Sequence, residues 1–196
     1  MYDYIKGTIV ELNPTETVLE NSNIGYHILI SLQTYSHLSP GTDAKLFLYH
    51  HLREDSELLY GFSDKEERHL FTLLIDVNGV GPNTARMMLS SLTTEELRNA
   101  IIGGDINRIK GVKGIGLKTA QRIIIDLKDK IVKGAPAGQS GTFALSASSQ
   151  IREEASSALI LLGFSKPNVE KVLDSILKEK PDNKLETLIK EALKRL

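Results

Sequence analysis

The stretch that decides the fold of the middle of the chain is Lys110-Gly-Val-Lys-Gly-Ile-Gly-Leu-Lys-Thr-Ala120. An earlier stretch, Val77-Asn-Gly-Val-Gly-Pro-Asn-Thr-Ala85, has the same pattern of Gly-aliphatic-Gly, two further residues and Thr-Ala. Gly79 and Gly114 correspond at an offset of 35 residues. Repetition of a pattern indicates a structural unit that occurs more than once. We therefore expect two copies of one turn-and-helix unit.

The residue types of this unit suit the binding of an anion. Glycine tolerates positive φ and lets the backbone come close to a partner, and the aliphatic residue between the glycines anchors the turn. The helix that follows presents N–H groups without intrahelical partners and the positive end of its dipole, which together bind phosphate. Pro82 stands where the first such helix should begin, a position at which proline loses no hydrogen bond. Each copy is therefore predicted to hold a phosphate group.

Two nucleotide-binding motifs are excluded. The second copy has the glycine spacing of a P-loop, but Leu117 occupies the position of the required lysine. Thr84 and Thr119 stand where a dinucleotide-binding Gly-x-Gly-x-x-Gly motif needs its last glycine. An ordinary glycine-rich turn between helices would explain either copy alone. The shared Thr-Ala register of the two copies argues against that interpretation.

Gly79-Val-Gly-Pro82 and Gly114-Ile-Gly-Leu-Lys-Thr-Ala120 resemble paired helix–hairpin–helix motifs, which grip the nucleic-acid backbone without reading base sequence. The resemblance implies binding of DNA but leaves open what is done to it. The DNA-backbone contacts that we expect are Gly79, Val80, Gly81, Asn83 and Thr84 in the first copy, and Lys113, Gly114, Ile115, Gly116, Lys118, Thr119 and Arg122 in the second.

Charge is distributed unevenly along the chain. The net charge is −1, but residues 1–64 carry −6, residues 65–133 carry +4, residues 134–150 carry no charge and residues 151–196 carry +1. Positive charge therefore collects in the segment that holds both repeats, where a phosphate-binding surface needs it.

Composition limits the other classes of function. The chain has 196 residues, of which 41% are hydrophobic and 25% charged, as in a soluble globular protein. Without cysteine there is no disulfide, thiolate metal site or cysteine nucleophile, and we expect no metal and no cofactor. The start of the chain lacks the pattern of a signal peptide, and no apolar run is long enough to span a membrane, so we expect a cytoplasmic protein.

Residues 1–63 predict a small β-barrel of the OB type, with a small β-sandwich as the alternative. Alternating apolar and polar residues indicate five strands, and one helical turn is expected between the third and the fourth. The expected strands are Ile5–Leu12, Glu16–Asn21, Ile24–Ser31, Ala44–Arg53 and Leu58–Phe62, and the turn is Gln33–Leu38.

Arg53-Glu-Asp-Ser-Glu57 lies between the last two expected strands and should form a projecting acidic hairpin tip, for which a solvated turn is the plain interpretation. The neighbouring His50 and His51 do not make a metal site. Adjacent strand residues point to opposite faces, and no third ligand accompanies them.

Residues 64–133 predict an all-helical module. Capping-box patterns at Ser63–Glu66 and Thr93–Glu96 begin two of its helices, and Gly103 and Gly104 end the second. The longest helix is expected over Leu117–Val132.

Residues 134–149 have the composition of a flexible tether. Residues 150–196 predict three amphipathic helices, Gln150–Leu162, Pro167–Lys178 and Asn183–Leu196. Leu159, Leu162 and Phe164 are interpreted first as core and second as partner surface. The Leu162-Gly-Phe164 turn is similar to that of ubiquitin-associated-type bundles, which bind other proteins.

This order of parts, an α+β multi-domain arrangement, resembles the RuvA family of bacterial Holliday junction proteins over essentially the whole chain. Its more specific marks are Met1-Tyr-Asp-Tyr-Ile-Lys-Gly7, Arg53-Glu-Asp55 followed by Leu58-Leu-Tyr-Gly-Phe62, and the two hairpins. This chain departs from the family's pattern at three hairpin positions. The family often has lysine where Asn83 and Leu117 stand, and proline is common where Lys113 stands.

The resemblance implies a non-catalytic protein that binds four-way DNA junctions in homologous recombination and DNA repair. It implies a homotetramer, alone or as two stacked tetramers, that lays the junction on one flat face. Lys113, Lys118 and Arg122 would lie near duplex phosphates, and Glu54 and Asp55 would form an acidic pin at the junction centre. The tail, through Leu159, Leu162 and Phe164, would bind a RuvB-type ATP-driven motor, and a RuvC-type junction nuclease is a further partner of the complex.

Two alternatives stay open from the sequence. One is a helix–hairpin–helix repair enzyme, for which Asp126 and Asp129 on one helix are the available carboxylates, although with Lys128 and Lys130 they form a solvated face. The other is a scaffold that binds only proteins, whose hairpins should show no salt-dependent affinity for DNA.

Overall fold

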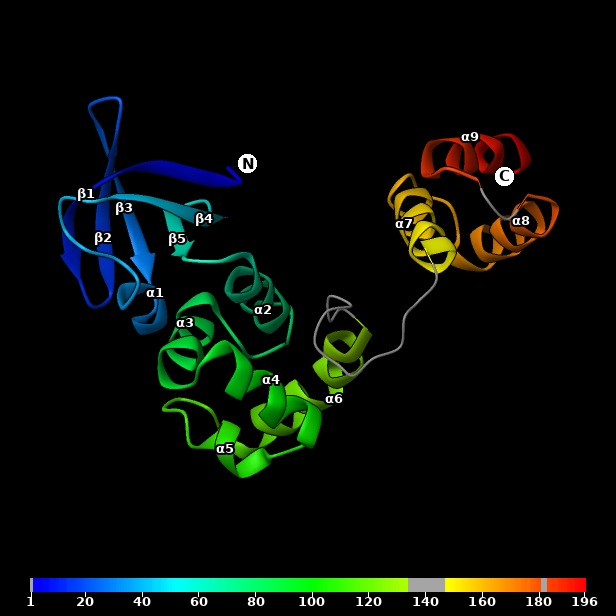
Figure 1. Ribbon diagram of the computed structural model, residues 1–196. Helices are drawn as coiled ribbons and strands as arrows, with labels where there is room; N and C mark the ends of the chain where they lie inside the picture. Colours follow the sequence, from blue (N-terminus) through cyan, green and yellow to red (C-terminus); the bar gives the residue numbers. More distant parts are fainter. Residues whose placement is uncertain (1, 134–146, 181–182) are drawn as a thin grey trace. The chain divides into compact units, whose positions relative to one another are not determined.

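The computed structural model describes residues 2–133, 147–180 and 183–196, and the chain divides into two compact units, residues 1–136 and 137–196 (Figure 1). The first unit holds a β-barrel followed by a helical module, and the second is a helical bundle. The residues predicted as a tether lie outside the described part up to residue 146, and the last three of them belong to a helix.

Five strands form a closed barrel in the order β1-β2-β3-β5-β4, as expected for the OB type and not for a sandwich. The pairs are antiparallel except β3 with β5, which are parallel. The strands are β1 (Tyr4–Asn13), β2 (Glu16–Asn21), β3 (Ile24–Ile30), β4 (Asp43–Leu52) and β5 (Glu57–Phe62), and a short helix α1 (Leu32–Tyr35) follows β3. All five predicted strands are confirmed within two residues at each end.

Alternation along the strands fills the barrel. Because successive strand residues point to opposite faces, apolar residues at alternate positions of a strand lie inside the barrel. The buried interior consists of Ile9, Leu19, Ile28, Ile30, Leu46 and Leu48. Gly61 is required on β5, because a Cβ there would lie 2.5 Å from Cγ2 of Ile28.

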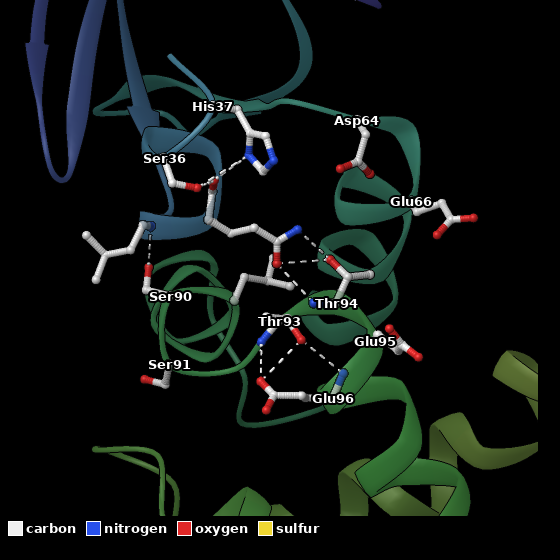
Figure 2. A pocket seen from close by; sticks show the side chains of 13 residues that line it. Ser36, His37, Asp64, Glu66, Ser90, Ser91, Thr93, Thr94, Glu95 and Glu96 are labelled. Carbon is white, nitrogen blue, oxygen red and sulfur yellow. Dashed lines mark hydrogen bonds between the residues drawn. The ribbon is translucent and has the colours of Figure 1, made fainter. Parts of the chain in front are cut away.

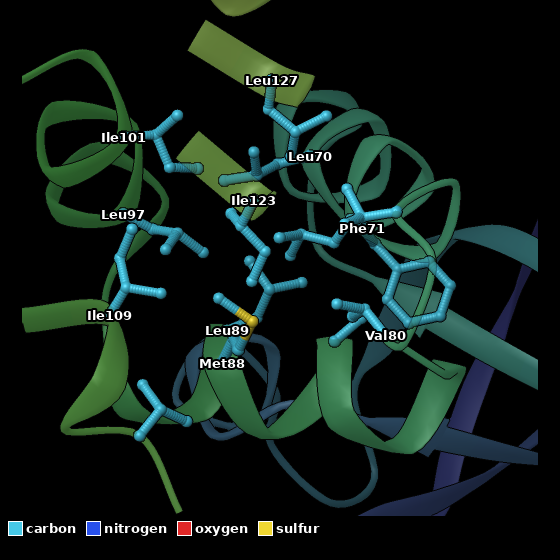
Figure 3. Packing of buried hydrophobic residues seen from close by; sticks show 14 of the residues in the cluster. Leu70, Phe71, Val80, Met88, Leu89, Leu97, Ile101, Ile109, Ile123 and Leu127 are labelled. Carbon is cyan, nitrogen blue, oxygen red and sulfur yellow. The ribbon is translucent and has the colours of Figure 1, made fainter. Parts of the chain in front are cut away.

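The helical module packs around one core that continues under the barrel (Figure 3). Its helices are α2 (Lys65–Ile75), α3 (Pro82–Ser91), α4 (Thr94–Gly103), α5 (Ile106–Lys110) and α6 (Leu117–Lys133). Leu70, Met88, Leu97, Ile123 and Leu127 from four helices meet in this core. The capping box at Thr93 and Glu96 is confirmed, and Gly104 ends α4 in the left-handed conformation.

The predicted cap of α2 is wrong by one residue. Asp64, not Ser63, accepts the hydrogen bond from the backbone N–H of Glu67. Asp and Ser are equally good at this position, so the sequence pattern could not separate them. The side chain of Glu67, whose N–H makes this bond, is fully buried.

Glu67 joins the barrel to α2. The hydroxyl of Ser31 donates to Oε1, and the hydroxyl of Thr34 donates to Oε2 at 2.6 Å. Ser31 directly follows β3, and Thr34 lies on α1. The hydroxyl of Thr34 also accepts a hydrogen bond from the backbone N–H of Ser63 at 3.0 Å. Burial raises the pKa of Glu67, and the hydrogen bonds from the two hydroxyls oppose that rise.

The second unit contains α7 (Ala147–Leu161), α8 (Lys166–Glu179) and α9 (Leu185–Arg195), which enclose a small core. The three predicted helices are confirmed, although α7 begins three residues earlier than expected. The buried core consists of Ala155, Leu159, Val169, Leu173, Ile176, Leu188 and Ala192. Leu162 was interpreted as core, but 62% of it is exposed, because α7 ends just before it and Gly163 turns the chain at a φ of 100°.

Candidate nucleic-acid interface

The two glycine-rich stretches form the same turn. In the first, the N–H of Val80 donates to the carbonyl of Val77 at 3.0 Å; in the second, Ile115 donates to Val112 at 3.1 Å. Gly79 and Gly114 have φ values of 94° and 89°. Positive φ is strained for residues with a Cβ, so glycine is required at both positions. The predicted repeat is thus a structural repeat at an offset of 35 residues.

Each turn leads directly into the start of a helix. Ala85 and Ala120 donate to the carbonyls of Gly81 and Gly116, both at 2.9 Å, which sets the first turns of α3 and α6 in the same register. Gly81 is the N-cap of α3 and supplies no side-chain cap. The first N–H groups of such a helix point outward and attract an anion. Both helix starts therefore leave backbone N–H groups without intrahelical partners, which is the arrangement that an anion site needs.

The two hairpins pack against each other reciprocally. A Cβ on Gly79 would lie 3.9 Å from Oγ1 of Thr119, and a Cβ on Gly114 would lie 3.8 Å from Cε of Met87. Met87 and Arg122 occupy equivalent positions of α3 and α6. Each hairpin loop therefore lies against the helix of the other copy, which brings the two hairpins together.

Cations flank these helix starts. Lys113 and Lys118 are exposed on the second hairpin and at the start of α6. Arg122 is also exposed, and its Nη1 donates to the carbonyl of Asn78 at 3.2 Å. Arg122, which is predicted to lie beside a phosphate, therefore makes a structural contact with the first hairpin loop.

Asn83 differs from the lysine that is frequent in the resembled family, and its side chain is turned toward the barrel. Its Oδ1 accepts a hydrogen bond from the hydroxyl of Tyr60 at 3.4 Å. Asn83 can therefore offer phosphate its backbone N–H, while its side chain contacts β5. Leu117, the other departure, is exposed at the first position of α6 and adds no charge.

The acidic tip joins β4 to β5. The N–H of Arg53 donates to the carbonyl of Ser56 at 2.8 Å, which closes the turn and leaves Glu54 and Asp55 exposed at its end. Nε of Arg53 donates to Nε2 of His51 at 2.9 Å. The only cation of the tip is therefore directed back along the strand, and the two carboxylates form its outer end.

A groove of about 810 Å³ lies between α1, the start of α2 and the α3–α4 junction (Figure 2). Its lining includes four carboxylates, those of Asp64, Glu66, Glu95 and Glu96. Clustered carboxylates repel phosphate. The groove is therefore not part of the nucleic-acid interface.

The tail exposes apolar side chains at the end of α7. Leu161 is 87% exposed and Leu162 is 62% exposed, whereas Phe164 is half-buried. Leu159 is fully buried and belongs to the core, so it is not available for the partner contact that was its second interpretation. Leu161 was missed by sequence reasoning. It follows Leu159 and Ile160 in one continuous apolar run, and such a run does not indicate which of its side chains are exposed to solvent.

Other sites are not found in the described residues. Within the residues that the structure places, no group of three His, Cys, Asp or Glu side chains could hold a metal ion. Asp126 and Asp129 are both exposed on α6. None of the helices in the described ranges is sufficiently long and apolar to cross a membrane.

Comparison with known proteins covers nearly the whole chain. Residues 1–61 match the model of the RuvA N-terminal domain, residues 71–129 match that of the SAM-like helix-hairpin-helix tandem, and residues 150–196 match that of the RuvA C-terminal domain. The chain is also similar to proteins called Holliday junction branch migration complex subunit RuvA. It is 50% identical over 201 residues to that of Bacteroides fragilis, 49% over 202 residues to that of Bacteroides thetaiotaomicron and 48% over 197 residues to that of Flavobacterium psychrophilum.

In all three alignments the full length of both proteins is covered. The arrangement of parts and the geometry of the two hairpins agree with this similarity. The chain therefore belongs to the RuvA family of Holliday junction branch migration complex subunits.

Proposed function

We propose that this protein is the non-catalytic subunit of a branch migration complex and that it binds four-way DNA junctions. The observation that carries the proposal is the pair of adjacent, equivalent hairpins on the same compact unit as an exposed acidic tip. Hairpins that present N–H groups to phosphates suit duplex arms of any sequence. Two carboxylates repel the phosphates that converge where strands cross.

The hairpins and the tip would act in opposite senses. Backbone N–H groups at the starts of α3 and α6, with Lys113, Lys118 and Arg122 beside them, attract the arms. Glu54 and Asp55 oppose tight seating of the crossover and keep strands apart while base pairs exchange. The chain carries no nucleotide-binding motif, so the work of migration comes from a partner ATPase of the RuvB type.

We assign residues 1–63 to the barrel, 64–133 to the tandem hairpin module, 134–149 to a linker and 150–196 to the motor-binding part. The exposed Leu161 and Leu162 and the half-buried Phe164 support a partner surface on the last of these. A homotetramer, alone or stacked in pairs, would present four copies of the hairpins to the four arms. We also propose that a RuvC-type nuclease is a partner of the complex and that the protein is cytoplasmic.

The test compares a labelled four-way junction with a linear duplex of equal length by fluorescence anisotropy, across a range of salt concentrations. We expect tighter binding to the junction and a steep loss of affinity with salt, because phosphate contacts release counterions. Equal affinity for both DNAs would contradict junction binding. Binding that is insensitive to salt would contradict the role of the hairpins.

A matched pair of variants locates the contact. Gly114→Ala and Gly41→Ala each place a Cβ at positive φ, and each should cost about 1 kcal/mol of stability. Gly41 lies before β4, away from the hairpins, so only Gly114→Ala should weaken DNA binding, by about tenfold if one phosphate contact is lost. Equal loss of affinity in both variants would show that strain, not the hairpin, is responsible.

A further inference from the structure

One edge of α3 faces the barrel with three polar side chains. Asn83, Arg86 and Ser90 are spaced three and four residues apart, so they lie along the same side of the helix. Sequence reasoning assigned Asn83 to DNA and gave no role to Arg86 or Ser90. We call these three residues the barrel-facing edge of α3.

The three contacts reach three separate parts of the barrel. Asn83 accepts the Tyr60 hydroxyl of β5 at 3.4 Å. Nη1 of Arg86 donates to the carbonyl of Thr15, between β1 and β2, at 2.6 Å. At the far end of α3, the hydroxyl of Ser90 accepts the backbone N–H of Leu32, the first residue of α1, at 3.1 Å.

The same helix links the first hairpin to the strand that follows the acidic tip. Its start belongs to the first hairpin, and Tyr60 lies on the strand that follows the acidic tip. Contacts at both ends and in the middle of α3 oppose sliding of the helix along the barrel and rotation about a single contact. Figure 1 shows α3 below the barrel, beside α1.

We propose that the barrel-facing edge of α3 is a positioning device that holds the first hairpin at a fixed distance from the acidic tip. It rests on the proposed function, because fixed spacing has value only when hairpins and tip meet one DNA molecule together. Binding groups that are already held in the bound geometry lose little conformational entropy when DNA binds. Hairpin and tip contacts to one DNA molecule therefore strengthen each other. A linear duplex meets the hairpins alone and gains nothing from the spacing.

The proposal predicts a loss of selectivity rather than of DNA binding. Loosening the edge should lower affinity for the four-way junction and leave affinity for linear duplex unchanged. A purely stabilising role would instead change the two affinities together or change neither. The ratio of the two dissociation constants therefore separates positioning from stabilisation.

The principal variant combines Tyr60→Phe with Ser90→Ala in the full chain. It removes one hydroxyl at each end of the edge and alters no charge, and the exposed Asn83 keeps water as a partner. Amide hydrogen exchange of Leu32, whose N–H loses its acceptor, reports whether the edge has loosened. We expect faster exchange at Leu32, about tenfold weaker junction binding and duplex binding within about twofold of the wild type.

A second set of variants addresses the middle contact. Arg86→Gln should reduce selectivity, and Arg86→Lys, which keeps a donor able to reach the carbonyl of Thr15, should restore part of it. Lys128→Gln removes the same charge from an exposed position on α6 and serves as the control for electrostatic loss. The control should weaken junction and duplex binding equally.

Two results would overturn the positioning role. One is faster exchange at Leu32 with unchanged junction affinity, and the other is a parallel fall in junction and duplex affinity in the double variant. Equal affinity of the wild type for both DNAs would be a different result, because it overturns the proposed function itself and the positioning role with it.

Discussion

Glu67 offers a test of how the barrel and the helical module are joined. Its carboxylate is fully buried and accepts hydrogen bonds from Ser31 and Thr34, which are buried as well. Glu67→Ala leaves both hydroxyls without this acceptor. At about 1–3 kcal/mol for each unsatisfied buried group, the variant should lose about 2–6 kcal/mol of stability.

Glu67→Gln keeps the shape and one acceptor, so it separates the charge from the packing. Burial raises the pKa of Glu67 in the folded protein above its unfolded value. Its contribution to stability is then complete below the unfolded pKa and is lost as pH rises through the folded pKa. Between the two pKa values the slope approaches about 1.4 kcal/mol per pH unit. Glu67→Gln should remove this part of the slope and become relatively more stable as pH rises.

The assay is unfolding in urea, followed by tyrosine fluorescence. The chain has no tryptophan, and all six tyrosines lie between residues 2 and 60, so the signal reports the first unit and is insensitive to the tail. Stability of the wild type and of both variants is measured from acidic to mildly alkaline pH. A constant difference between wild type and Glu67→Gln across this range would refute the assignment of the pH dependence to this carboxyl. A loss below about 1 kcal/mol for Glu67→Ala would show that the two hydroxyls find other partners.

Three further predictions concern the tip and the tail. Glu54→Gln combined with Asp55→Asn should preserve or tighten junction binding, because repulsion at the crossover is removed, and should alter the rate of strand exchange; a drop in melting temperature would show instead that the tip is structural. Deleting residues 134–196 should spare DNA binding and abolish stimulation of the motor ATPase, whereas retained stimulation would contradict the assignment of the tail. Within the tail, Leu162→Glu should weaken motor binding without lowering the melting temperature, while Leu159→Ala should lower the melting temperature by loss of core packing.

Local patterns predicted the elements well where one physical cause dominates. Alternation gave all five strands, and the capping box at Thr93 with Gly104 bounded α4. The repeat gave two equivalent hairpins, because Gly79 and Gly114 need the same backbone conformation. In each case the signal lies within a few residues of the feature that it predicts.

Contacts between distant segments could not be predicted in the same way. Arg86 and Thr15 are 71 residues apart, and nothing near either residue points to the other. Ser63 and Asp64 are equally suitable caps, and the hydrogen bonds that join Glu67 to Ser31 and Thr34, more than 30 residues away, leave no signal near either cap residue. Leu159 and Leu162 look alike in the sequence, but Leu159 lies within α7 and is fully buried, whereas Leu162 follows the end of that helix and is exposed.

The contact between the hairpins shows where the two copies have diverged. Asn78 corresponds to Lys113, and Met87 corresponds to Arg122, at the same offset as the glycines. Arg122 reaches the carbonyl of Asn78, whereas Met87 packs beside Gly114. If the first copy were replaced by a duplicate of the second, an arginine at position 87 would correspond to Arg122 and would face the carbonyl of Lys113, as Arg122 faces that of Asn78. The contact between the copies therefore consists of one hydrogen bond and one apolar contact, and a perfectly symmetric tandem would lose the apolar contact of Met87 beside Gly114.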